Sequence, residues 1–169
     1  FYGLLSTIFE CFNTTAIPFN ITINKETNFL NNYINITTNE TKAKRVYNGI
    51  LNNISYNCLR SVYNAFLSNS KNFPCYKWKP QLWKIDNLIS KDIVYEIQQI
   101  SKRVFGEAHR LCGLVRFIEI GNNMFYSKIH PDNNVIEILG NHFIKRFPTQ
   151  NFILHDKNRN IVFLYNTKT

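Results

Sequence analysis

The sequence predicts an α+β protein: a helical N-terminal half, then a helix-strand-strand-helix-strand-strand unit with an antiparallel sheet. Apolar residues recur at helical spacing through residues 1–67, whereas residues 114–166 combine short apolar segments with Asn-rich turns. A chain of 169 residues suffices for one core. We therefore expect a single domain, built from a helical part (1–67), a connecting loop (68–89) and an α+β part (90–169).

Three helices are expected in the first part. The segments Leu4–Phe12 and Ala43–Ile54 each carry one apolar stripe. A third helix begins at Ser55, whose hydroxyl is placed to cap it, and extends to Leu67. The segment that follows contains two prolines and no regular period, which favours a loop.

A long helix and a hairpin open the α+β part. The helix is expected from about Ser90 to Gly113, a suitable stop residue. The apolar segment "LVRFIEI" (114–120), the turn "GNN" (121–123) and "MFYSKIH" (124–130) then predict two paired strands.

One more helix and a second hairpin complete the expected fold. The stretch "PDNN" (131–134) offers a helix start with Asp132 near the cap, and Pro148 halts that helix. The segments "NFILHD" and "IVFLYN" flank a "KNRN" turn. The four strands are expected to form one antiparallel sheet with helices on one face.

Composition narrows the class of protein. Hydrophobic residues make up 44% and charged residues 18%, which excludes a disordered chain. No apolar run approaches the roughly 18 residues of a membrane span, so we expect a cytoplasmic protein. Because the sequence starts at Phe1 and not at a methionine, a targeting signal ahead of it stays open. No zinc spacing or CxxC pair occurs, so neither a metal nor a cofactor is expected, and reduced core thiols are expected at Cys11, Cys58, Cys75 and Cys112.

The net charge is +9, and it is distributed unevenly. Residues 1–40 carry −2, residues 41–110 carry +8 and residues 111–169 carry +3. Such an excess favours nucleic acid as a partner over a membrane. A lysine-rich surface produced by coding bias is an equally weighted alternative.

The stretch "GEAHRLCGLVRF" (106–117) gathers an acid, a histidine and two arginines. Residues two apart on a helix point about 200° from each other, so Glu107 and His109 do not share a face. Arg103 and Arg110 are instead the expected ion-pair neighbours of Glu107. We therefore expect a structural Arg-Glu-Arg stripe and a separate histidine.

Arg116 and two later pairs of residues are further candidates. Strand alternation places Arg116 on an apolar face, where it needs Asp156 or Glu107 as a partner or else binds a phosphate. His142 and Arg146 are four apart and share a helix face. Asp156 and Arg159 flank the last turn and could simply close it.

Motifs of known enzymes do not decide the activity. The sequence contains no HExxH, Walker or GxSxG motif. The candidates for acid-base chemistry are His109, His142, Glu107 and Asp156, and for each histidine an ordinary core or surface role is the better interpretation.

Two long segments resemble a known family. "SKRVFGEAHRLCGLVRF" and "YSKIHPDNNVIEILGNHFIKRFPTQNFILHDKNR" are similar to uncharacterised bacterial proteins assigned to DNA metabolism or DNA repair, a domain of unknown function. The shared pattern is E-x-HR, G-x-x-RF, P-x-x-NV, HF-x-x-RF-x-x-Q and D-x-x-R. The resemblance covers nearly the whole chain, and it departs at Phe152, where the family often has tryptophan.

The resemblance implies partners more than an activity. Members are typically encoded beside a radical-SAM protein that resembles DNA repair lyases, so a radical-SAM partner is expected, and any radical chemistry would belong to that partner. The leading hypothesis is a DNA-binding accessory protein whose defined anion site uses Arg110, Arg116, His142, Arg146 and Arg159. The alternatives are an enzyme that acts on nucleic acid or a nucleotide by His/carboxylate chemistry, and a protein-interaction partner.

Overall fold

The computed structural model describes residues 1–13, 34–69 and 91–167. The α+β class is confirmed: helices occupy the first half, and a four-stranded sheet with one helix between its strand pairs occupies the second. Most of the expected connecting loop, 68–89, lies outside the described residues. Contacts divide the chain into an N-terminal unit (Phe1–Phe66 and Ser70–Gln99) and a C-terminal unit (Leu67–Asn69 and Ile100–Thr169). No helix among the described residues is long and apolar enough to cross a membrane.

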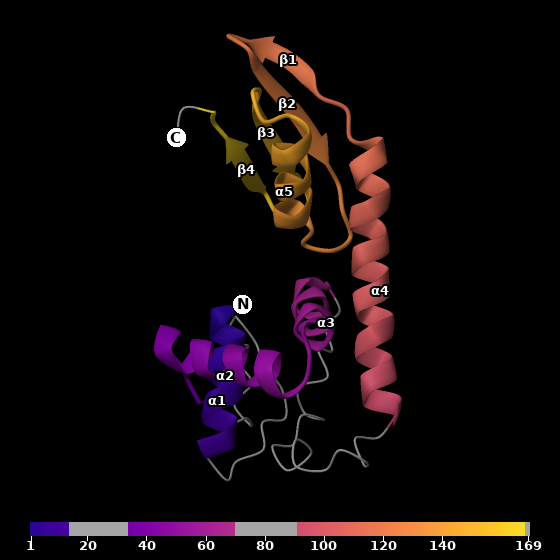
Figure 1. Ribbon diagram of the computed structural model, residues 1–169. Helices are drawn as coiled ribbons and strands as arrows, with labels where there is room; N and C mark the ends of the chain where they lie inside the picture. The colour runs from indigo at the N-terminus through magenta and orange to yellow at the C-terminus, as the bar shows by residue number, and fades with distance from the viewer. Residues whose placement is uncertain (14–33, 70–90, 168–169) are drawn as a thin grey trace, which may run out of the picture. The chain divides into compact units, whose positions relative to one another are not determined.

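The N-terminal unit contains the three expected helices, α1 (Tyr2–Asn13), α2 (Glu40–Asn53) and α3 (Tyr56–Leu67) (Figure 1). Ser55 caps α3 as expected, since its hydroxyl accepts a hydrogen bond from the Cys58 N–H at 3.1 Å. The apolar stripes of the helices meet in one core: Leu4, Leu5, Ile8, Ala43, Val46, Ile50 and Leu59. This packing of small and branched side chains stabilises helices that would be marginal alone.

The C-terminal unit contains the sheet, whose strands are β1 (Ile118–Gly121), β2 (Met124–Ile129), β3 (Asn151–Asp156) and β4 (Ile161–Tyr165). They lie in the order β1-β2-β3-β4, and both hairpins are antiparallel as expected. The two central strands are parallel, so the expectation of a wholly antiparallel sheet is wrong. The reason is the crossover through α5 (Ile136–Arg146), which links the end of β2 to the beginning of β3. Because the chain returns to the end of the sheet at which β2 began, β3 runs in the same direction as β2.

Helix α5 covers one face of the sheet (Figure 1). Phe152, Leu154 and Asp156 of β3 are buried on that face, because side chains alternate along a strand. Gly140 lets α5 approach β4 closely: a Cβ there would lie 2.5 Å from the ring of Phe163. The expected cap at Asp132 is wrong, since α5 begins after Val135 and has no side-chain cap.

The long helix α4 (Lys91–Leu114) ends one residue past the expected Gly113, and the first strand begins only at Ile118. Residues 115–117 therefore belong to neither element. The expectation that strand alternation buries Arg116 is wrong, because Arg116 is exposed and precedes the strand.

Candidate nucleic-acid interface

The loop between β2 and α5, Pro131–Asn134, is held from one side by Glu107 of α4. Glu107 is only 8% exposed. Its carboxylate accepts hydrogen bonds from the backbone N–H of Asp132 at 2.6 Å and of Asn133 at 2.9 Å, and from the Asn133 side-chain amide at 2.7 Å. These bonds compensate for the burial of the charge.

The expected ion pairs of Glu107 with Arg103 and Arg110 are therefore wrong. Both arginines are exposed, and the ion pairs formed among the described residues do not include Glu107. Helical spacing alone suggested them, but a buried carboxylate gains more from a loop that presents several N–H donors than from a solvated arginine.

Asp156 and Arg159 hold the same loop from the β3–β4 turn. Asp156 is fully buried and accepts a hydrogen bond from the Arg159 guanidinium at 3.0 Å as well as from the backbone N–H of Asn158 and of Arg159. The guanidinium of Arg159 also donates to the carbonyl oxygens of Pro131 and Asp132. The two residues thus close the turn, as the turn-closing interpretation predicted, and they also bind the loop, which that interpretation did not predict.

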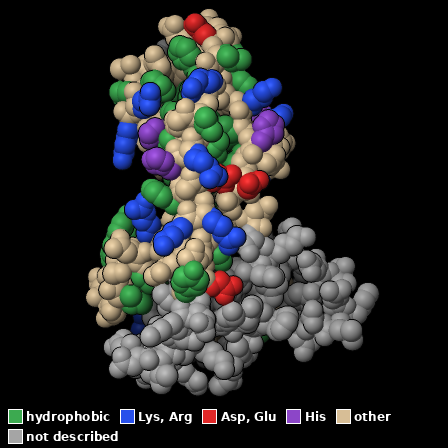
Figure 2. All heavy atoms as spheres, turned by 90° about the vertical axis from the view of Figure 1, so that its right-hand side faces the viewer, with side chains coloured by type: hydrophobic (Ala, Val, Ile, Leu, Met, Phe, Trp, Pro, Cys, Tyr) green, Lys and Arg blue, Asp and Glu red, His purple; other side chains and the backbone are tan. Residues whose placement is uncertain are grey.

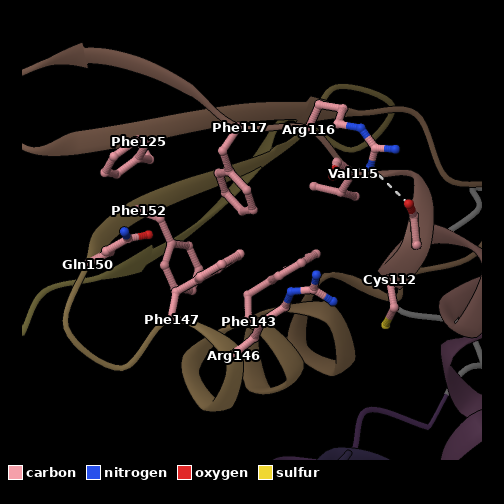
Figure 3. Close-up of a pocket in the computed structure, with 11 residues that line it drawn as sticks. Cys112, Val115, Arg116, Phe117, Phe125, Phe143, Arg146, Phe147, Gln150 and Phe152 are labelled. Atoms are coloured by element: carbon pink, nitrogen blue, oxygen red, sulfur yellow. Dashed lines mark hydrogen bonds between the residues drawn. The ribbon is translucent and has the colours of Figure 1, made fainter.

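A pocket of about 550 Å³ lies in the same unit, between the end of α4, the sheet and the end of α5 (Figure 3). We call it the arginine–aromatic pocket. Its lining consists of Cys112, Gly113, Val115, Arg116, Phe117, Phe125, Phe143, Arg146, Phe147, Gln150 and Phe152. The volume is within the range of small-ligand sites, roughly 300–1,000 Å³.

Arg116 lines the pocket from the segment after α4, and its guanidinium is turned toward the end of that helix (Figure 3). Its Nη1 donates to the carbonyl oxygens of Gly113 at 2.9 Å and Val115 at 3.2 Å, so Arg116 satisfies acceptors at the end of α4 (Figure 3). Both bonds come from one guanidinium nitrogen, Nη1. The other guanidinium N–H groups make no hydrogen bond to the residues that the structure describes. The guanidinium is therefore oriented by the helix end while retaining donors for an anion.

Arg146 comes from the last turn of α5, and its guanidinium lies 5.6 Å from the ring centre of Phe147. Within the described residues, no carboxylate pairs with Arg116 or Arg146. The pocket thus contains two arginines whose charge is not compensated by the described part of the protein.

Four of the lining rings, those of Phe117, Phe143, Phe147 and Phe152, form one packed group. The ring of Phe117 makes edge-to-face contacts with Phe143, Phe147 and Phe152, with centroids 5.1, 6.0 and 5.5 Å apart. Phe143 and Phe152 are buried, whereas Phe117, Phe125 and Phe147 are half-buried. Edge-to-face packing fixes the ring orientations and leaves part of three rings open to the pocket.

The remaining candidates lie elsewhere. His109 and Arg110 are exposed on α4, and His109 packs beside Phe105 at 6.4 Å. His142 packs against Phe143, and its Nε2 is buried without a hydrogen-bond partner in the described structure. Glu107 accepts its hydrogen bonds from the loop, and Asp156 accepts its hydrogen bonds from the last turn and from Arg159. Neither carboxylate is therefore hydrogen-bonded to a candidate histidine in these contacts.

Of the five expected anion-binding residues, only Arg116 and Arg146 are among those that line the arginine–aromatic pocket. Sequence reasoning missed Phe125. What identifies Phe125 as a pocket residue is the parallel register of β2 and β3, which places Phe125 beside Phe152. An antiparallel assumption conceals that pairing.

Metal ligands and a thiol are the other reactive groups to place relative to the pocket. Among the described residues, no group of three His, Cys, Asp or Glu side chains is placed to hold a metal ion. Burial raises the pKa of the Cys112 thiol at the pocket edge, which keeps it protonated.

Comparison with known proteins identifies the family. No curated protein and no solved structure was found to match the chain. The profile of a family described as a domain of unknown function, DUF4130, matches residues 75–169. This range includes every residue of the pocket and the loop Pro131–Asn134. That match covers more than half of the 169 residues. The chain therefore belongs to the DUF4130 family.

Proposed function

We propose that the protein binds DNA and acts as an accessory protein in DNA metabolism or repair, with the arginine–aromatic pocket as its defined contact. The observation that carries the proposal is the pair Arg116 and Arg146, two arginines without a carboxylate partner among the described residues, beside half-buried aromatic rings. Guanidinium groups suit phosphate oxygens, and aromatic rings suit bases.

The charge of the C-terminal unit supports the same proposal. Residues 100–169 contain ten Lys or Arg and five Asp or Glu, a net charge of +5, and two of those acids are the carboxylates that hold the loop. In the view of Figure 2 the Lys and Arg side chains stand apart from one another, among apolar, uncharged, His and a few Asp or Glu side chains, and do not form one continuous patch. Such a surface suits weak contacts to a polyanion around a more specific pocket.

A radical-SAM protein is the partner we propose for this activity. The proposal rests on the resemblance described above. The partner would catalyse the reaction, and this protein would bind the DNA. Mixing the two purified proteins with DNA tests this: a ternary complex in size-exclusion chromatography is expected, and two independent peaks at all salt concentrations would contradict it.

Fluorescence anisotropy with labelled oligonucleotides tests DNA binding itself. Affinity of about 10⁻⁴ to 10⁻⁶ M is expected at physiological salt, falling steeply as salt rises. Arg146→Gln is expected to weaken binding. The matched control is Lys128→Gln, because Lys128 is an exposed base whose side chain points to the opposite face of β2 from Phe125.

Equal effects of Arg146→Gln and Lys128→Gln would remove the pocket from the proposal. An absence of binding at low salt would remove DNA binding altogether. Melting curves of both variants check that the fold is retained.

A further inference from the structure

We infer that the arginine–aromatic pocket receives one unstacked base of a DNA strand together with its adjacent phosphate. The protein would therefore prefer single-stranded or locally opened DNA to an intact duplex. This inference rests on the proposed DNA binding and adds the form of the substrate to it.

The volume and aromatic lining of the pocket favour more than a purely electrostatic contact. A backbone phosphate needs only an open cationic surface, and a pocket of about 550 Å³ with rings around it offers much more. The half-buried rings of Phe117, Phe125 and Phe147 are apolar and flat, so their natural partner is another flat ring. In an intact duplex the faces of the bases are stacked on each other, and only a base moved out of the stack can present a face to these rings.

Two of these rings, those of Phe117 and Phe147, are held in place before any ligand arrives. Phe117 is packed edge-to-face against the buried rings of Phe143 and Phe152. The ring of Phe147 is parallel to that of Phe143 within 3°, with centroids 6.1 Å apart. Fixed rings cost little ordering entropy when a base stacks on them, which favours binding.

Polar groups lie at both ends of the aromatic lining. In Figure 3 the guanidinium groups of Arg116 and Arg146 lie on one side of the rings, and the side-chain amide of Gln150 lies on the other. A nucleotide has the same division, with an anionic phosphate at one end and a hydrogen-bonding base edge at the other. The arginines match the phosphate, and the Gln150 amide, which both donates and accepts, matches the edge of a base.

Neither arginine is neutralised within the described structure, which distinguishes this pocket from a structural ion-pair cluster. The contrast is Arg159, whose guanidinium is bonded to the Asp156 carboxylate and two carbonyl oxygens. Arg116 is bonded to carbonyl oxygens only, and Arg146 faces a ring. Both therefore remain cationic donors at the pocket.

The test compares three labelled ligands of equal length by anisotropy: a single strand of thymidylate, the same strand with abasic sites at every position, and the intact duplex. The abasic strand keeps the phosphates and lacks the bases. We expect the thymidylate strand to bind about tenfold or more tighter than the other two, since base stacking is sequence-tolerant and of that order. Gln150→Ala and Phe147→Leu are expected to weaken binding of the thymidylate strand more than binding of the abasic strand, and so to reduce this preference.

The outcomes separate this inference from the proposed function. Equal, salt-sensitive binding of all three ligands would overturn base insertion while DNA binding stands. No binding of any ligand would overturn both. Thymidine monophosphate that binds while all three long ligands fail would identify a small-molecule site and overturn both as well.

Discussion

The buried carboxylate of Glu107 accepts two hydrogen bonds from a single residue, Asn133, one from its backbone N–H and one from its side-chain amide. A residue of α4 thus fixes the loop that precedes α5. Asn133 extends the connection, because its side-chain oxygen accepts the N–H of Asn69 at 3.1 Å.

Replacing Glu107 by glutamine should therefore destabilise the protein. The amide group would turn a donor toward N–H donors of Asp132 or Asn133, and we expect a loss of about 1–3 kcal/mol in the free energy of unfolding. Urea denaturation followed by circular dichroism measures it. The control is Glu119→Gln on the exposed strand β1, and a loss no larger than in that control would contradict the role of Glu107.

The buried pair Asp156 and Arg159 should be more costly to break. Asp156→Asn is expected to lose about 3–5 kcal/mol, because it leaves the half-buried guanidinium without its carboxylate. The double variant Asp156→Asn/Arg159→Gln should lose less than the sum of the two single changes. Additive losses would show that the two side chains are not coupled.

The exposed pair Glu40 and Lys44 of α2 is the matched control for that cycle. Its two side chains are both largely in water, so the same double-mutant cycle should give a much smaller coupling. Since Arg159 is engaged in the fold, Arg159→Gln should also change stability more than DNA affinity.

Two helical glycines should respond oppositely to alanine. At Gly140 the added Cβ would meet the Phe163 ring, and we expect a net loss of about 1–3 kcal/mol from the forced shift. At Gly106 nothing lies within 4 Å, so alanine should stabilise α4 by up to about 1 kcal/mol. Thermal unfolding measures both, and a stabilised Gly140→Ala would contradict the close approach of α5 to β4.

The thiol of Cys112 should alkylate slowly near neutral pH. Burial raises its pKa, so the reactive thiolate forms only at higher pH than in a free cysteine. The rate of modification by N-ethylmaleimide, read from the Cys112 peptide by mass spectrometry, should still be rising at pH values where free cysteine has levelled off. A midpoint at or below that of free cysteine would contradict the burial.

The sequence predicted the helices and hairpins well, because their signals are local: apolar spacing, Ser55 as a cap and Asn-rich turns. It did not predict the parallel pairing of β2 with β3. The apolar pattern of a strand says which face is buried and not which neighbour it pairs with, and the direction depends on how α5 crosses between them.

The candidate site, like the fold, could be predicted where the signal is local and could not be predicted where it depends on contacts distant in sequence. The family motif contained Arg116, Phe117, Arg146, Phe147 and Gln150, yet spacing gave no reason to group them. Periodicity misplaced Arg116, since "LVRFIEI" fits a strand while its first residue closes α4. Glu107 was paired with helix neighbours because the loop that binds it is 25 residues away in sequence.

Arg116 has two roles in one side chain, as it satisfies the carbonyl oxygens at the end of α4 and lines the pocket. Occupancy of the pocket and fraying of the last helical turn are therefore coupled equilibria. A bound anion that immobilises this guanidinium should slow amide hydrogen exchange around Leu111 to Val115, so binding at the pocket would stabilise the end of the helix that forms one of its walls.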